Sequence, residues 1–318
     1  MAGMSEGGNV DAWQLGPADR EQSAARILAL ILGGYLETFR DCEVSVRADL
    51  DPEELHRFRV SLRRARSILD AGTDVFPAEE LILLSALASW FATVTSPVRD
   101  LDVLLAAMAS LNGALVPEMA DAGEALDEAL VVERGAAQLA LVHAMDGERY
   151  PVLLRRWQTM STVFRVGGGE PGPDAHRPMG EVADELVMAS FRRLRKRGKL
   201  AMKTDDLDAW HDLRKAIKRF RYLVAAFAPM YPAGTFKKVL RHLTDLQDTL
   251  GRLQDYHVHA AIVERVGVEE CGRAALAAGV VADSLHRDAS MMHAHCRDAW
   301  TEFDRPKLRR QVHAALAG

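Results

Sequence analysis

The chain has 318 residues, a net charge of −5 and 6% aromatic residues. It is long enough to bury a large core, and its charge argues against a generally basic nucleic-acid binder. The three scattered cysteines, Cys42, Cys271 and Cys296, form neither a disulfide framework nor a CxxC metal motif, which is typical of a reducing cytoplasm. The apolar run from Ile27 to Leu32 is too short to span a bilayer, so no membrane partner is expected.

The first half of the chain is predicted to be helical. Helix-forming residues dominate and alternating β-branched runs are missing, which favours an all-α fold. Residues 1–18 are polar, lack a signal-peptide core and are expected to be disordered. Helical periodicity then predicts long helices over 19–48, 52–71, 78–110 and 118–145, and a shorter one over 148–165. Asp51 and Pro52 are typical of a helix start, and Pro97 should bend or break the third helix.

A glycine- and proline-rich stretch separates this half from the next. Residues 166–178 begin Val-Gly-Gly-Gly-Glu-Pro-Gly-Pro, which cannot continue a helix and predicts a linker. Beyond it, periodicity predicts helices over 179–200, 206–229, 234–263 and 268–302, and a short one after Pro306. Each half thus has four long helices, the number in an antiparallel bundle. We expect one helical bundle over 19–165 and a second over 179–318.

The same cationic pattern occurs twice, 155 residues apart. Apolar-His-x-x-Arg-x-x-apolar-[Arg/Lys]-Arg-x-Arg begins at Leu55 and again at Trp210. The ungapped register extends to Phe76-Pro77 and Tyr231-Pro232, which indicates an internal duplication. At about 100° per residue, each copy forms a cationic stripe beside an apolar one, so the charges should lie at the edge of a helix–helix contact. The stripes are His56, Arg59, Arg63 and Arg66 in the first copy, and His211, Arg214, Lys218 and Arg221 in the second.

The stripes have the chemistry of an anion site. Residues 55–69 and 210–224 hold ten of the 40 Lys and Arg residues and one acid, Asp212. Arginine grips phosphate with a planar fork, lysine adds a point charge, and histidine donates hydrogen bonds. Ion pairing with neighbouring helices is the simpler explanation for one such stripe, but two in register favour a long or multiply charged anion. Asp100 and Asp255 are expected to anchor these arginines or cap helices. Arg99 could contact the ligand or form an ion pair, and the ion pair is slightly favoured.

Other motifs point to no cofactor, metal or catalytic residue. His257 and His259, like His293 and His295, are two residues apart and would point about 200° away from each other on a helix. The glycines at 167–172 lack the lysine of a phosphate-binding loop. Trp90, Trp157 and Trp300 are predicted as core residues.

These features resemble the CHAD domain, the conserved histidine α-helical domain. In each copy an aspartate, Asp100 or Asp255, follows the histidine by 44 residues, and the resemblance covers about residues 19–305. It implies two pseudo-symmetric four-helix bundles with a basic channel between them that binds inorganic polyphosphate. The implied ligand residues are His56, Arg59, Arg63, Arg64, Arg66, His211, Arg214, Lys215, Lys218, Arg219, Arg221, the neighbouring aromatic Tyr222, and Lys238 and Arg241, which could extend the wall.

The resemblance also shapes the expected function. Lys238 and Arg241 correspond to Leu83 and Ala86 in the first copy, so the C-terminal wall should dominate binding. We expect a stand-alone, non-enzymatic polyphosphate-binding protein, cytoplasmic and associated with polyphosphate granules, because no alternating Glu-x-Glu-x-Lys strand of a triphosphate-hydrolysing partner domain is present. The alternatives are a metal-dependent enzyme that processes phosphoanhydrides or nucleotides, and a scaffold for nucleic acid or protein. Nucleic acid is not the expected ligand, and the oligomeric state stays open.

Overall fold

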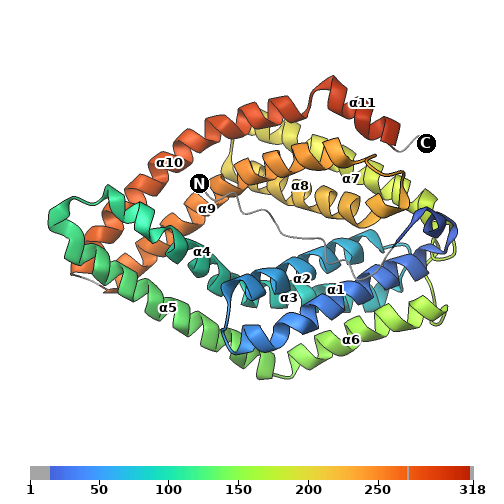
Figure 1. Ribbon diagram of the computed structural model, residues 1–318, viewed down its shortest axis with the longest axis horizontal. Coiled ribbons are helices and arrows are strands. Elements are labelled where there is room, and N and C mark those ends of the chain that lie inside the picture. Colours follow the sequence, from blue (N-terminus) through green and yellow to red (C-terminus); the bar gives the residue numbers. More distant parts are fainter. Residues whose placement is uncertain (1–14, 271, 316–318) are drawn as a thin grey trace.

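The computed structural model describes residues 15–270 and 272–315, and within them all regular structure is helical except one isolated bridge between Ser23 and Pro178. The all-α prediction is confirmed. The α-helices, with the same labels as in Figure 1, are α1 Ala24–Arg47, α2 Pro52–Ala71, α3 Ala78–Val94, α4 Ser96–Leu111, α5 Ala120–Asp146, α6 Arg149–Val163, α7 Met179–Thr204, α8 Leu207–Phe227, α9 Lys237–Glu270, α10 Arg273–Phe303 and α11 Pro306–Ala315.

The two helices that carry the cationic motif begin in the same way. The Asp51 side chain accepts a hydrogen bond from the backbone N–H of Glu53 at the start of α2 (2.8 Å). Asp206 accepts one from the N–H of Ala209 at the start of α8 (2.7 Å). Each aspartate satisfies a backbone donor that the first turn of a helix leaves unpaired. The starts of α1 and α2 precede those of α7 and α8 by the predicted 155 residues, although the duplication itself stays a prediction.

The predicted helix over 78–110 is two helices, α3 and α4, which meet at Thr95. Pro97 is the second residue of α4, where its missing N–H is tolerated, whereas inside one continuous helix its ring would clash with the preceding turn. Of the predicted bend or break at Pro97, the structure shows a break, which lies two residues earlier at Thr95. In the second half the corresponding segment is a single helix, α9.

The hydrophobic core does not divide at the linker. The larger buried cluster draws on both halves, including Phe58 of α2 and Phe220 of α8. A smaller cluster joins α4 and α5 to the end of α9 and the start of α10, through residues such as Leu126 and Val281. Figure 1 shows these four helices converging at one end of an elongated molecule. The two predicted bundles thus share their cores rather than standing apart.

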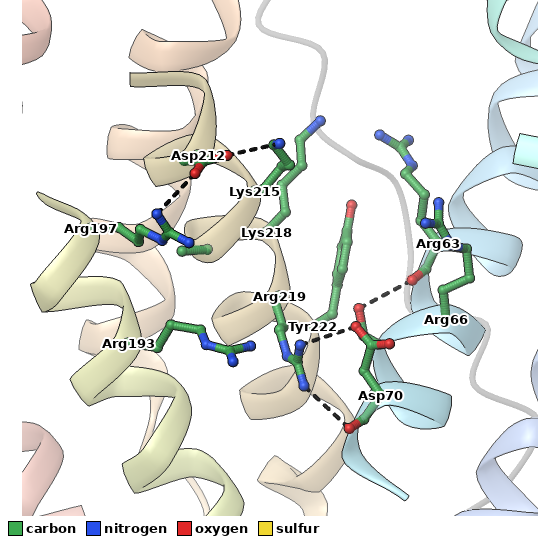
Figure 2. Close-up of a pocket in the computed structure, with 12 residues that line it drawn as sticks. Arg63, Arg66, Asp70, Arg193, Arg197, Asp212, Lys215, Lys218, Arg219 and Tyr222 are labelled. Carbon is green, nitrogen blue, oxygen red and sulfur yellow. Dashed lines mark hydrogen bonds and ion pairs between the residues drawn. The ribbon is translucent and has the colours of Figure 1, made fainter. Parts of the chain in front are cut away.

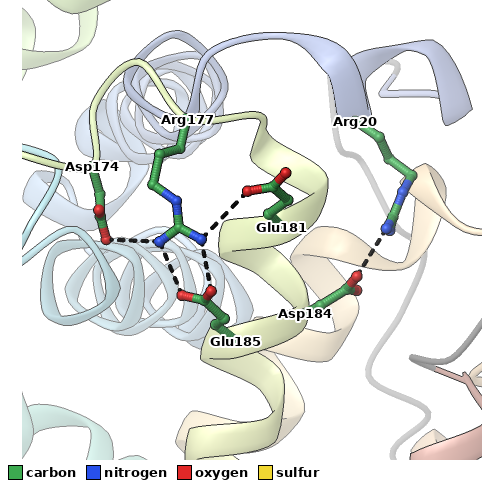
Figure 3. Close-up of polar contacts among 6 residues, drawn as sticks. All are labelled: Arg20, Asp174, Arg177, Glu181, Asp184 and Glu185. Atoms are coloured by element: carbon green, nitrogen blue, oxygen red, sulfur yellow. Dashed lines mark hydrogen bonds and ion pairs between the residues drawn. The ribbon is translucent and has the colours of Figure 1, made fainter.

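A short segment before α1 docks onto the second half. The 3₁₀ helix Pro17–Glu21 places Arg20 within 2.9 Å of Asp184 on α7 (Figure 3). Tyr231 donates a hydrogen bond of 2.5 Å to the same carboxylate. A Cβ at Gly180 would lie 2.9 Å from the Arg20 Nε, so glycine permits this close approach. Leu15 is also buried. The predicted disordered stretch 1–18 lies outside the described residues up to position 14, but residues 15–18 are ordered.

The linker is held in place by backbone and side-chain contacts. The Gly172 N–H donates to the Val75 carbonyl (3.0 Å), and the Asp174 N–H to the Asp74 carbonyl (2.8 Å), which attaches the linker to the loop after α2. Arg177 pairs with three carboxylates, Asp174, Glu181 and Glu185 (Figure 3). This segment fixes α7 relative to α2.

One apolar stretch is relevant to the prediction that the protein has no membrane partner. Residues 78–114 are long and apolar enough to cross a membrane by length and composition, because they contain an 18-residue window with a mean hydropathy of 1.7. The stretch is divided at Thr95, and Leu84, Ala88 and Phe91 pack into the core. The absence of a membrane partner stays a prediction.

Candidate functional site

A pocket of about 420 Å³ lies where α2, α7 and α8 meet. Arg63 and Arg66 of the α2 stripe face Lys218 of the α8 stripe across it, and α7 forms a third side (Figure 2). The apolar faces of α2 and α8 are buried, which holds the charged side chains at the edge of the helix contact. The lining residues are Arg63, Arg66, Ser67, Asp70, Arg193, Arg197, Asp212, Lys215, Ala216, Lys218, Arg219 and Tyr222.

The two aspartates of the pocket neutralise only some of its seven Lys and Arg side chains. Asp70 lies 3.0 Å from the Arg219 guanidinium. Asp212, the one acid of the two stripes, pairs with Arg197 of α7 (3.0 Å) and with Lys215 (2.9 Å). These pairs set the orientation of three cations and leave the pocket with an excess of positive charge.

Four pocket cations have no carboxylate partner in the part of the chain that the structure describes: Arg63, Arg66, Arg193 and Lys218. Burial, followed by repulsion from Arg214 and Arg63, holds the pKa of Lys218 well below its usual value. The Arg63 Nε is buried without a hydrogen-bond acceptor. An unpaired cation and an unsatisfied donor both cost free energy, so an anion in this pocket would relieve an unfavourable arrangement.

The pocket borders a second group of charges in the middle of the molecule. Burial raises the pKa of Asp100 on α4, while the nearby Arg59 opposes this shift and Asp255 of α9 adds to it. Asp255 lies 3.9 Å from Arg214 of α8, and burial lowers the pKa of Arg214. Asp255 therefore anchors Arg214, as predicted. The predicted ion pair of Arg99 does not form within the described residues.

Arg59 has a different position from the one expected. Its guanidinium donates to the Ala92 carbonyl (3.3 Å), the Thr95 hydroxyl (2.5 Å) and the Ser96 hydroxyl (3.2 Å), all at the α3–α4 junction. Burial lowers the pKa of Arg59 to about 10. Arg59 does not line the pocket, because these acceptors at the break between α3 and α4 hold its guanidinium.

His211 and Arg214 line a separate cavity of about 330 Å³ between α8 and α9. The His211 Nδ1 lies 2.6 Å from the Gln254 side-chain oxygen, so this histidine is held by α9 rather than directed into the pocket. Trp210 and His257 belong to the same cavity. Among the described residues, no group of three His, Cys, Asp or Glu side chains could hold a metal ion.

The remaining predicted ligand residues do not line the pocket. Lys238 and Arg241 line a third cavity of about 590 Å³ beside α11, so the extension of the wall toward them is wrong for this pocket. The side chains that do not line the pocket also include His56, Arg64 and Arg221; Arg221 lies over the Tyr222 ring, 5.1 Å from its centroid. These placements depend on the direction in which each helix leaves the loop before it, and helical periodicity does not predict that direction.

Sequence reasoning missed two of the pocket's cations, Arg193 and Arg197 of α7. Both belong to the run Arg-Arg-Leu-Arg-Lys-Arg-Gly-Lys at 192–199, which lies outside the repeated motif. The run is itself a visible signal. Its position beside α8 depends on Gly198, where the Trp300 ring of α10 packs directly against the helix backbone.

An all-helical fold with a basic pocket between its two halves defines the class of protein. The family model of the CHAD domain matches residues 30–264, and the chain belongs to this family. A crystal structure of the CHAD domain from the plant Ricinus communis is similar over 96% of this chain and 97% of its own, with 25% identity and a TM-score of 0.75. PptA from Streptomyces chartreusis shares the fold over 88% of this chain and 99% of its own, with 19% identity and a TM-score of 0.67.

Curated relatives are uncharacterised proteins of two Mycobacterium tuberculosis strains, CDC 1551 / Oshkosh and H37Rv. Each is 26% identical over 219 residues, which is 65% of this chain. The chain spans about 40% of the length of these relatives. The expectation of a stand-alone protein therefore stays a prediction.

Proposed function

We propose that this CHAD protein binds inorganic polyphosphate in the pocket between α2, α7 and α8. The observation that carries the proposal is the group of unpaired cations there, Arg63 and Arg66 on one side and Arg193 and Lys218 on the other. A linear polyanion with a charge on each phosphate can meet all of them at once, and the arginine forks suit its non-bridging oxygens. The family is linked to polyphosphate, which agrees with this chemistry.

Binding rather than catalysis is the proposed role. The pocket's two carboxylates, Asp70 and Asp212, are both paired with cations, which disfavours a role as general base or as ligand for Mg²⁺. A cytoplasmic location, with association to polyphosphate granules, belongs to the same proposal. Incubation with polyphosphate and Mg²⁺ or Mn²⁺ tests the enzymatic alternative, because phosphate release would contradict a pure binding role.

The direct test is titration of the protein with long-chain polyphosphate. We expect binding that weakens steeply with salt, since each phosphate neutralised releases counterions. The variant Arg63→Glu/Arg66→Glu should lose most of this affinity because it reverses one side of the pocket. The matched control is Arg26→Glu/Arg155→Glu, which makes the same charge change at exposed positions on α1 and α6.

The outcomes separate clearly. Salt-sensitive binding that the pocket variant loses and the control retains supports the proposal. The proposal would be refuted if the pocket variant and the control bound polyphosphate with equal affinity while both kept the melting temperature of the wild type. Displacement of polyphosphate by RNA at comparable concentration would favour the nucleic-acid scaffold instead.

A further inference from the structure

The second half of α7 continues the positive charge of the pocket onto the outer surface. Arg193 and Arg197 line the pocket itself. Arg192, Arg195, Lys196 and Lys199 surround an adjoining shallow cavity of about 280 Å³. One helix therefore contributes cations to two neighbouring cavities.

The two sets of side chains form adjacent rows on α7. At about 100° per residue, Arg192, Lys196 and Lys199 fall within roughly 60° of one another, and Arg193 and Arg197 follow about 100° further around the helix. Lys203 continues the outer row by one more turn, so the row from Arg192 to Lys203 is about 16 Å long at ~1.5 Å per residue. A chain that leaves the pocket row can reach the outer row by passing around about a quarter of the helix circumference.

The outer row is not explained by ion pairing. Arg195 pairs with Asp304 (2.7 Å) and Arg197 with Asp212 (3.0 Å). The outer Arg192, Lys196 and Lys199 are exposed and have no ion-pair partner in the described part of the chain. Solvated helix faces usually alternate acids and bases at a spacing of four, but residues 186–204 contain no Asp or Glu.

The fold does not require this charge. In the 155-residue register, Arg192 corresponds to Glu37 on α1, and Lys196 to Asp41. The equivalent helix of the first half thus carries acids at the same places in the sequence. The basic row is therefore a feature of α7 in the second half and has no basic counterpart on α1 in the first half.

We propose that the outer row of α7, Arg192, Lys196 and Lys199, is a second contact surface for the same polyphosphate chain, which leaves the pocket on the α7 side. This inference rests on the proposed function. Long polyphosphate would contact both rows, whereas tripolyphosphate would occupy the pocket alone. The row has no exposed aromatic side chain on which nucleobases could stack, which favours polyphosphate over single-stranded RNA.

The test compares tripolyphosphate with long-chain polyphosphate in the full chain. The variant is Arg192→Gln/Lys196→Gln/Lys199→Gln, which removes three charges and leaves the pocket residues in place. The control is Arg26→Gln/Arg155→Gln/Arg165→Gln, at exposed positions with no ion pair among the described residues. Affinity is measured at several salt concentrations, and circular dichroism checks the helical content.

We expect unchanged affinity for tripolyphosphate and weaker binding of the long chain. The slope of log affinity against log salt should fall by about 2, since each cation contributes about 0.7 on a single-stranded polyanion. The ratio of wild-type to variant affinity should therefore change about 16-fold between about 50 mM and about 200 mM salt.

Each other outcome overturns the inference in a recognisable way. Wild-type protein that fails to bind long-chain polyphosphate removes the proposed function itself. If the wild type binds but the α7 variant matches the control, the pocket binds polyphosphate and the outer row does not. An equal loss for short and long chains would assign the row to the pocket. Loss of RNA binding alone would assign it to nucleic acid.

Discussion

Replacement of Lys218 by methionine should make the protein more stable and its binding weaker. Lys218 is half-buried and has no ion-pair partner among the described residues, and it lies one turn after Arg214 on α8. Like charges four residues apart cost about 0.2–0.5 kcal/mol on a helix, and complete burial of a polar group without a partner costs about 1–3 kcal/mol, which is an upper limit for the half-buried Lys218. Methionine keeps the apolar stem and removes both costs, so we expect Lys218→Met to gain about 1–2 kcal/mol, or a few degrees in Tm.

The binding of polyphosphate should change in the opposite direction. A hydrogen bond to a charged group contributes about 1.5–3 kcal/mol, so loss of the ammonium should weaken binding at least about tenfold. Differential scanning calorimetry and isothermal titration calorimetry measure the two effects on the same samples. Lys307→Met is the control, because Lys307 is exposed on α11 and outside the pocket.

The gain in stability depends on pH in a defined direction. The pKa of Lys218 in the folded protein is below the ordinary value of 10.5, so the folded state releases its proton first. The penalty in the wild type is therefore complete below the folded pKa and disappears as the pH rises toward 10.5. A variant that is less stable than the wild type at neutral pH, or one with unchanged affinity, would refute this account of the pocket.

Further predictions concern the contacts that position α7. Gly198→Ala places a Cβ about 2.0 Å from the Trp300 ring and should cost about 1–3 kcal/mol of unfolding free energy in urea titrations, whereas Gly279→Ala, with open space around its Cβ, should be neutral or slightly stabilising. Equal stability of the two variants would contradict the assigned packing. Asp184→Ala removes the acceptor of the Tyr231 hydroxyl and should cost about 1–3 kcal/mol by the same assay; a loss no larger than that of an exposed Asp→Ala control would show that the hydroxyl finds another acceptor.

Much of the local structure followed from short-range sequence. Asp51 and Pro52 fixed the start of α2, and its observed bounds equal the predicted ones. The 3.6-residue period determined that Arg63 and Lys218 lie beside buried faces, because a helix places residues three and four apart on one side. Both motif helices could therefore be predicted, together with the pocket that their cations share.

The tertiary structure decided which partners each of these side chains meets. Arg59 and Arg214 occupy equivalent motif positions, yet Arg59 binds the α3–α4 junction while Arg214 lies near Asp255 of the unbroken α9. A periodic pattern gives the face of a helix but not the helix that packs across it.

The tertiary structure likewise decided which side chains form the sides of the pocket. Sequence by itself determined an all-helical chain and two basic stripes. Lys238 was expected at the pocket and lies in a different cavity, while Arg193 of α7 was not expected and lines it. The direction in which each helix leaves its loop sets these positions. That direction depends on contacts between distant residues, such as the linker with the loop after α2 and Gly198 with Trp300, which no local pattern encodes.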